Sequence, residues 1–369
     1  AGGGHRAAAI ALQDVINKSH PEWTVRLVNL FEVLDPKGRF KKLTGLAPED
    51  LYNMRLKRGW TLGLSTELKV LQSMIKMSHA KLMRNLEQFW SLYPSDLVVS
   101  LVPNFNKVIY ESVKNQMPDT PYVTVLTDMA DYPPHFWIEE GLDQHIVCGT
   151  DFAVNQAKLA GYGDSQISQT SGMILKPAFY EFVPIDVRQE RINLGLNPDM
   201  PTGVVMFGGQ GSSDMLRIAK SLTNTQLILL CGHNYRLVEK LNTQTTIATH
   251  LAVGFTPNVE KYMRMGDFFI GKPGPASISE AIHMGMPVIT TENAWTMPQE
   301  RFNTKWIREH GIGIVIPTFR QIRQCVNELL GELQTYKNSV ASMKKNKAVF
   351  EVVDALSNKI ESRVKCTKY

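Results

Sequence analysis

The sequence is poor in cysteine and contains no long apolar run. Its four cysteines lie far apart, and no two of them form a CxxC pair. Isolated thiols favour a reduced, cytosol-like compartment over a disulfide framework or a zinc site. No apolar stretch approaches the roughly 18 to 20 residues that a membrane-spanning helix needs. We therefore expect neither a membrane span nor a signal peptide.

Patterns that bind metal ions are missing as well. The sequence has no Asp-x-Asp, and its nine histidines are scattered rather than grouped with other ligands. Zinc sites require such ligands at close spacing. We therefore predict a protein that works without a metal or another cofactor.

The length and composition are those of a globular protein with two domains. The chain has 369 residues, of which 43% are hydrophobic and 20% charged, and it is long for a single domain. The positive charge is confined to one segment. Residues 36–90 hold eleven Lys or Arg and four Asp or Glu, a net +7, whereas the rest holds 29 basic and 31 acidic residues, a net −2.

Short β-branched runs alternate with amphipathic stretches in the second half. The runs predict six strands, at 203–207, 227–230, 250–253, 268–270, 287–290 and 312–316. Strands that alternate with helices indicate a parallel sheet covered on both faces, and six units complete a doubly wound domain. We predict this domain at 186–345, after a linker at 184–198 and before a helical tail at 346–369.

The first half, 1–185, shows the same pattern less clearly. Predicted strands lie at 25–28, 97–101, 122–126 and 145–148, and predicted helices at 6–18, 107–116 and 152–159. A glycine-rich turn, Gly2–Gly4, leads directly into the first helix. Because such a turn normally follows a strand, we expect the first strand of this domain to be absent from the sequence.

Glycine clusters mark two predicted strand-to-helix junctions, Gly2–Gly4 and Gly208–Ser213. Glycine lets the backbone approach a ligand, and the following helix offers free N–H groups that suit phosphate. Neither cluster has the ending of a P-loop or the third glycine of GxGxxG. Taken alone, each cluster is equally well interpreted as a structural turn.

A third junction follows the predicted strand at 268–270. Lys272-Pro273-Gly274 leads into a Ser-rich helix start, where N–H donors remain unused. Glu280 lies about one turn further on, where a carboxylate can accept two ribose hydroxyls. It is also interpretable as an ordinary acid that stabilises a helix start.

Six motifs occur in one order along the chain: Gly2–Ala9, Gly208–Ser213, Cys231–Asn234, Gly254-Phe255, Lys272–Ala281 and Pro298–Asn303. In this order they resemble the family of monogalactosyldiacylglycerol synthases and processive diacylglycerol glucosyltransferases, which is related to the peptidoglycan GlcNAc-transferase that makes lipid II. The resemblance extends from residue 2 to about residue 352. It implies an α/β GT-B fold, in which two Rossmann-like doubly wound domains face a cleft and the second holds the donor.

The same resemblance assigns the donor site. It places Gly254 and Phe255 against uracil and the hydroxyls of the ribose on Glu280. The residues implied for the diphosphate and the sugar are Gly208, Gly209, Gly211, Ser212, Gly274, Pro275, Ala276, Ser277, Gln299, Glu300 and Asn303. Ala276 and Ser277 replace the family's Gly and Thr. The residues that lead into the last motif, 292–295, are atypical of the family, so the transferred sugar can be galactose or glucose.

Transfer with inversion needs a base for the proton of the acceptor hydroxyl. His5 follows the glycines, and an imidazole suits this role near neutral pH, although a turn or anion contact is the alternative. A family acid just before the glycines is a rival base that this sequence does not include. Asp128 is predicted either to orient His5 or the acceptor, or to cap the turn at 130–133. Without a metal, helix N-termini would stabilise the leaving diphosphate.

The basic segment interleaves charge with Met, Leu and Trp. Such a surface suits anionic lipids, and solvated helix faces over a Met-rich core are the alternative. No nucleic-acid recognition motif is present. We assign five residues to the acceptor or membrane side: Gly3, Gly4, Lys57, Arg58 and Trp60.

These patterns predict an inverting enzyme that transfers galactose or glucose from a UDP-sugar to diacylglycerol. Its expected partners are the UDP-sugar, diacylglycerol and anionic membrane lipids. The same fold acting on another lipid or a polyprenyl acceptor is one alternative, and a catalytically silent binding module is another. We expect peripheral attachment at a cytoplasmic face, or at a plastid envelope if the source is a plant.

Overall fold

The computed structural model describes residues 3–35, 72–181 and 185–366, which form two compact units. Unit 1 comprises 1–177, 297–299 and 346–369, and unit 2 comprises 178–296 and 300–345. The chain thus leaves the first unit after residue 177, returns briefly at 297–299, leaves it again and ends in it.

A four-stranded parallel sheet forms the centre of unit 1, in the order β1-β2-β3-β4. Three of its strands confirm predictions to within one residue at each end. The fourth was missed because its three residues are mostly half-exposed and carry little apolar pattern. The strands are β1 Val98–Ser100, β2 Tyr122–Val125, β3 His145–Cys148 and β4 Ile167–Gln169.

The strand predicted at 25–28 was wrong. The structure describes this segment without strand pairing, and Leu27 and Val28 are 44% and 45% exposed. A β-branched apolar run favours a strand only where a neighbouring strand and a core are available, and this run has neither.

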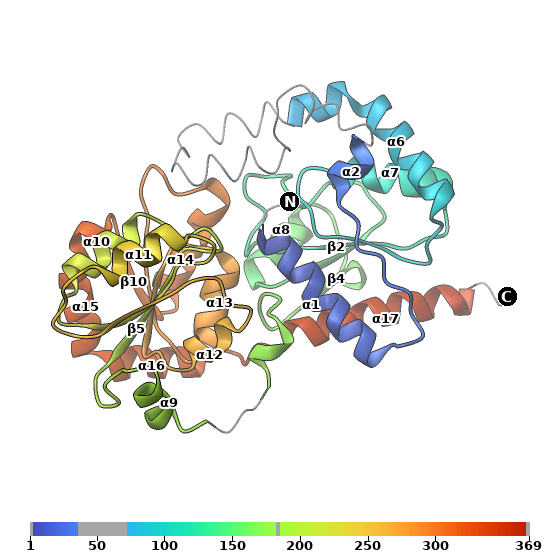
Figure 1. The fold of residues 1–369 in the computed structure, drawn as a ribbon. Coiled ribbons are helices and arrows are strands. Elements are labelled where there is room, and N and C mark those ends of the chain that lie inside the picture. The colour runs from blue at the N-terminus through green and yellow to red at the C-terminus, as the bar shows by residue number, and fades with distance from the viewer. Residues whose placement is uncertain (1–2, 36–71, 182–184, 367–369) are drawn as a thin grey trace. The chain divides into compact units, whose positions relative to one another are not determined.

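Helices enclose the sheet of unit 1. The first buries a stripe of alanine and aliphatic side chains and packs along α17, the last helix of the chain (Figure 1). The pair α6 and α7 closes around Trp90, whose indole N–H donates to Ser112 at 2.9 Å. The helices are α1 Gly3–Ser19, α2 Leu30–Leu34, α6 His79–Leu92, α7 Asn106–Gln116, α8 Asp151–Leu159 and α17 Ala348–Cys366, with short 3₁₀ turns at Asp164–Gln166 and Pro177–Phe179.

Unit 2 is built on six parallel strands in the order β10-β9-β8-β5-β6-β7. This is the order of a doubly wound Rossmann sheet, and all six strand predictions are confirmed to within one residue at each end. Central strands such as β6 are buried on both faces, which explains their continuous apolar sequence. The strands are β5 Thr202–Met206, β6 Gln226–Leu230, β7 His250–Val253, β8 Phe268–Gly271, β9 Val288–Thr291 and β10 Gly313–Ile316.

Helices cover both faces of this sheet (Figure 1). The predicted linker at 184–198 contains one of them, α9. The helices are α9 Val187–Asn193, α10 Asp214–Ser221, α11 Tyr235–Asn242, α12 Val259–Met263, α13 Pro275–His283, α14 Arg301–Glu309, α15 Ile322–Gly331 and α16 Leu333–Ser342, with 3₁₀ turns η3 Pro298–Glu300 and η4 Phe319–Gln321.

The strand order of unit 2 determines where a ligand can bind. The order reverses between β5 and β8, which pair so that Met206 lies opposite Gly271. The loops that follow these two strands therefore leave the sheet next to each other. Open α/β sheets bind ligands at this point of reversal, outside the carboxyl ends of the strands.

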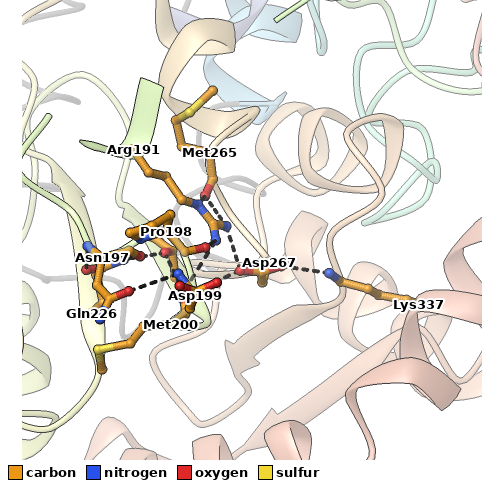
Figure 2. Close-up of polar contacts among 10 residues, drawn as sticks. Arg191, Asn197, Pro198, Asp199, Met200, Gln226, Met265, Asp267 and Lys337 are labelled. Carbon is orange, nitrogen blue, oxygen red and sulfur yellow. Dashed lines mark hydrogen bonds and ion pairs between the residues drawn. The ribbon is translucent and has the colours of Figure 1, made fainter. Parts of the chain in front are cut away.

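An ionic cluster secures the opposite, amino-terminal end of β8 (Figure 2). Asp267 accepts hydrogen bonds from Arg191 and Lys337, each at 2.7 Å. Arg191 also donates to the carbonyl of Met265 from Nε at 3.0 Å and Nη2 at 2.7 Å. The cluster thereby joins α9 and α16 to the loop that leads into β8.

Candidate active site

The loop after β5 makes a sharp turn that requires glycine. Gly208 and Gly211 have φ values of +76° and +59°, a region that L side chains seldom occupy. The loop packs on the turn after β6: a Cβ at Gly232 would lie 2.3 Å from the carbonyl oxygen of Gly209. The N–H of His233 donates to that same oxygen at 2.9 Å. The two loops thus form one fixed backbone surface at the carboxyl edge.

An aromatic pair extends this surface toward β7. The rings of His233 and Phe255 stack with centroids 4.1 Å apart and planes 14° from parallel. Phe255 is 53% exposed, so part of its surface is accessible to a ligand. Gly254 lies beneath Tyr235, whose ring would be 2.9 Å from a Cβ at that position. The close packing explains why a glycine precedes Phe255.

Helix α13 begins at the point of strand reversal. Gly274 is its N-cap and has no side chain to cap it, and Pro275 follows. The hydroxyl of Ser277 donates to the carbonyl of Gly274 at 3.2 Å. The first N–H groups of a helix have no intrahelical partner and carry positive dipole charge. This start is therefore suited to an anion. Glu280 lies further along α13 and is half-buried.

A buried carboxylate lies beside the helix start. The side chain of Glu300 is 7% exposed and lies 3.0 Å from Lys272 Nζ. Asn303 is fully buried and donates to the carbonyl of Pro273 at 2.7 Å, which fixes the loop between β8 and α13. The arrangement places a cation and a carboxylate next to each other at the edge where the helix N–H groups are free.

In unit 1, His5 lies in the first turn of α1. Its Nδ1 is 2.6 Å from the Oγ1 of Thr127, just after β2. The ring of Trp137 lies 5.6 Å away, tilted by 52°. Burial lowers the pKa of His5 to about 4, so the imidazole is neutral at neutral pH and its lone pair is available.

The loop after β2 is held by two buried carboxylates. Asp128 accepts the indole N–H of Trp137 at 2.9 Å. Asp131 accepts the backbone N–H groups of His135 at 3.0 Å and Trp137 at 2.6 Å. Burial raises the pKa of Asp131, although these hydrogen bonds oppose the shift. The residue that caps this turn is therefore Asp131, and the described role of Asp128 is to hold Trp137.

Comparison with known proteins gives a family match for each of the two groups of residues. A family model described as monogalactosyldiacylglycerol (MGDG) synthase matches residues 5–173, and one described as glycosyltransferase family 28 C-terminal domain matches residues 204–358. The chain thus resembles the family of monogalactosyldiacylglycerol synthases in its first part and family 28 glycosyltransferases in its second.

Individual monogalactosyldiacylglycerol synthases are distant in sequence. The chloroplastic monogalactosyldiacylglycerol synthase of Spinacia oleracea is 26% identical over 391 residues, covering 100% of this chain and 72% of its own. Monogalactosyldiacylglycerol synthase 1 of Arabidopsis thaliana, also chloroplastic, is 27% identical over 377 residues, covering 95% and 68%.

The fold agrees with the family. The crystal structure of Acinetobacter baumannii MurG matches with a TM-score of 0.60 at 12% identity, over 96% of both chains. The protein is a glycosyltransferase with the GT-B fold, as the sequence predicted, from a family that makes glycolipids. None of the helices that the structure describes is both long and apolar enough to cross a bilayer.

The structure places the family's predicted residues in two groups. The donor residues of unit 2 lie at the carboxyl edge of its sheet, and Gln299 lies in η3 directly before Glu300. His5 and Asp128 lie at the end of β2, and both contact the Trp137 region. Gly3 and Gly4 belong to the first turn of α1 rather than to a preceding turn. Predicted roles for all these residues stay predictions.

Three further predicted residues cannot be placed. Lys57, Arg58 and Trp60 lie outside the described residues. Conversely, Thr127, Trp137 and Lys272 were missed as site residues. The signal for Thr127 and Lys272 was position, because each stands at the carboxyl end of a parallel strand, where ligands bind.

Groups of possible metal ligands are the remaining feature of the site. Within the described parts of the chain, no three His, Cys, Asp or Glu side chains gather closely enough to hold a metal ion. Positive charge at the carboxyl edge of unit 2 is available from Lys272 and from the start of α13.

Proposed function

We propose that this enzyme transfers galactose or glucose from a UDP-sugar to diacylglycerol with inversion, without a metal ion, at a membrane surface. The observation that carries the proposal is the contact between the buried Glu300 and the partly exposed Lys272, beside the uncapped start of α13. It combines an acceptor for sugar hydroxyls with two sources of positive charge at the point where the strand order reverses. The plant relatives are monogalactosyldiacylglycerol synthases, and their names support diacylglycerol as the acceptor and galactose as the hexose.

Donor binding follows from the geometry of unit 2. The uracil would stack on the exposed face of Phe255, which His233 supports from behind. The backbone of Gly208–Ser213 and the start of α13 would hold the diphosphate, and Glu280 would take the ribose hydroxyls. Glu300, with Gln299, would accept hydroxyls of the hexose. Lys272, whose Nζ lies 3.0 Å from Glu300, would hold this carboxylate in place.

The leaving group would be stabilised by fixed charge. As the bond to the anomeric carbon breaks, negative charge develops on the diphosphate, and preorganised donors stabilise it more than mobile water does. The N–H groups of Ala276 and Ser277 point outward from the helix start, and the ammonium of Lys272 is near them in sequence. These groups would act in place of a divalent cation.

The acceptor would be activated in unit 1. The hydroxyl of diacylglycerol attacks the anomeric carbon, its proton passes to Nε2 of His5, and the bond to the UDP oxygen breaks. The neutral imidazole that burial maintains is the form that can take this proton. Trp137, held by Asp128, offers an apolar wall beside the base.

The proposed location is the surface of a membrane. Diacylglycerol is confined to bilayers, so the enzyme must dock there, and the segment at 36–90 with its net charge of +7 is suited to anionic lipids. Transfer to another lipid or polyprenyl acceptor is the second candidate, since the donor site described above would serve it equally.

The test is transfer of labelled hexose from UDP-galactose and from UDP-glucose to vesicles with and without diacylglycerol, in the presence of a chelator. Mass spectrometry identifies the lipid product. We expect monoglycosyldiacylglycerol, loss of product in Glu280→Ala, and full product in Glu239→Ala, a matched change at an exposed position of α11. UDP release without a glycosylated diacylglycerol would refute diacylglycerol as the acceptor. Activity that depends on added metal would refute the proposed metal-free mechanism.

A further inference from the structure

His5 and Thr127 are in direct contact in unit 1. The Nδ1 of His5 and the Oγ1 of Thr127 are 2.6 Å apart, although the two residues are 122 positions apart in sequence. Thr127 lies two positions after the end of β2, and β2 lies inside the sheet between β1 and β3. The hydroxyl is thus anchored close to a central strand, whereas His5 is in the first turn of α1.

From this contact we infer that Thr127 is a positioning residue, which accepts the Nδ1–H of His5 and so leaves the lone pair on Nε2 for the acceptor hydroxyl. The inference rests on the proposed role of His5 as base. A neutral imidazole carries its proton on one nitrogen only, and the partner of that nitrogen decides which one. When the Thr127 hydroxyl accepts a hydrogen bond from Nδ1, the proton stays on Nδ1. The lone pair is then on Nε2, which can act as the base.

The surroundings of the ring support one orientation. Trp137 lies 5.6 Å from the imidazole, tilted by 52°, and Asp128 holds its indole at 2.9 Å. A flip of the imidazole about its last side-chain bond would turn a carbon toward Thr127 and lose the hydrogen bond. The ring is therefore confined by the indole and oriented by the hydroxyl.

Threonine also differs chemically from the carboxylate that usually orients a catalytic histidine. A carboxylate stabilises the imidazolium that forms when the base takes its proton, whereas a neutral hydroxyl fixes direction and tautomer without adding charge. The role of Thr127 is therefore geometric. A change that removes only its hydroxyl should alter turnover while leaving the UDP-sugar bound as before.

The experiment combines nitrogen NMR with kinetics on the full-length protein. Labelling the nine histidines with ¹⁵N gives the tautomer of each neutral ring, and the spectrum of His5→Gln assigns the His5 signals. The variants are Thr127→Val, which keeps the shape without the hydroxyl, and Thr127→Ser, which keeps the hydroxyl. Thr124→Val is the matched control, because Thr124 is in β2 and bonds Gln144 instead.

We expect the parent protein and Thr127→Ser to hold the proton of His5 on Nδ1, and Thr127→Val to lose this preference. We expect kcat of Thr127→Val to fall about 10- to 100-fold, part of the 10²–10⁴ that a positioned base contributes. Its KM for the UDP-sugar should be unchanged. Serine should restore most of the rate, and Thr124→Val should leave the His5 signals in place.

Two results would overturn the inference. One is a proton on Nε2 of His5 in the parent protein, and the other is a His5 spectrum that Thr127→Val does not change. If the tautomer shifts as expected but kcat does not change, His5 is not the base and the proposed mechanism fails. Absence of any glycolipid product from the parent protein would refute the proposed function, whatever the NMR result.

Discussion

Removal of the Asp267 carboxylate should destabilise unit 2 more than removal of any exposed acid. The side chains of Arg191, Asp267 and Lys337 are 10%, 19% and 32% exposed, so the charges are largely shielded from water. Asp267 also accepts the backbone N–H of Thr202 at 3.0 Å. Asp267→Ala therefore leaves one buried guanidinium, one ammonium and one N–H without their acceptor.

The expected magnitude follows from what each group can do afterwards. Arg191 cannot reach water, and loss of one partner of a buried ion pair costs about 3–5 kcal/mol. It keeps hydrogen bonds to the carbonyls of Met265, Pro198 and Met200, which favours the lower end of that range. Lys337 can turn to solvent, so its share resembles that of a surface pair, about 0–1 kcal/mol. We expect a loss of about 3 kcal/mol in the free energy of unfolding.

The assay is urea unfolding at neutral pH, followed by tryptophan fluorescence. The matched control is Asp199→Ala, because Asp199 pairs with Arg188 on the surface, where the two side chains are 69% and 65% exposed. This control should lose much less stability than Asp267→Ala, because solvent screens an exposed pair. Equal losses in the two variants would refute the reasoning, because burial would then make no difference to the strength of the pair.

The effect should also depend on pH, with a definite sign. Burial alone would raise the pKa of Asp267, but hydrogen bonds from Lys337 and Thr202 and the positive charges of Lys337 and Arg191 hold it below its ordinary value. The ionised carboxylate therefore stabilises the fold fully above the unfolded-state pKa of about 3.9. That stability is lost as pH falls through the folded-state pKa. The difference between the parent and Asp267→Asn should shrink in acid, and a constant difference would contradict this account.

Three predictions concern function. Glu280→Ala should weaken UDP binding by at least about tenfold in calorimetry, because two hydrogen bonds of about 1 kcal/mol each are lost, and unchanged affinity would remove it from the donor site. His5→Ala should lower turnover by about 10²–10⁴ with little change in donor affinity, and a rate within a few-fold of the parent would exclude it as the base. Reversal of Lys57 and Arg58 to Glu should reduce co-sedimentation with anionic vesicles, at about 1 kcal/mol for each charge removed. Binding indifferent to lipid charge and to this reversal would count against a membrane role.

The fold of unit 2 was predictable because its signals are local. Each strand is a short, largely apolar run followed by a glycine or polar turn, and the alternation with helices allows few topologies. The chain at 25–28 shows the limit of such reasoning. Its residues have the composition of a strand, but strand formation depends on a partner that the local sequence does not reveal.

The candidate site was predictable only in part. Glycine loops and the Glu300 block are contiguous motifs, so sequence order revealed them. The contact between His5 and Thr127 joins residues far apart in the chain, and nothing near either residue announces it. Asp128 was predicted to orient His5 or the acceptor, or to cap a turn; it accepts the indole N–H of Trp137, and its role in catalysis stays a prediction. Asp128 and Asp131 are both carboxylates, so residue type does not show which of them accepts a hydrogen bond from which N–H group. The path of the loop decides this.

The packing of α1 along α17 has a consequence for how the protein is made. The ribosome synthesises α1 before unit 2 and α17 after it. Unit 2 therefore has its whole sheet available while α17 is still unsynthesised, and contacts between distant segments form slowly. The stripe on α1 that includes Leu12, Val15 and Ile16 is thus made long before α17 can pack along this helix. Nascent chains arrested before residue 348 should therefore bind chaperones through their first helix.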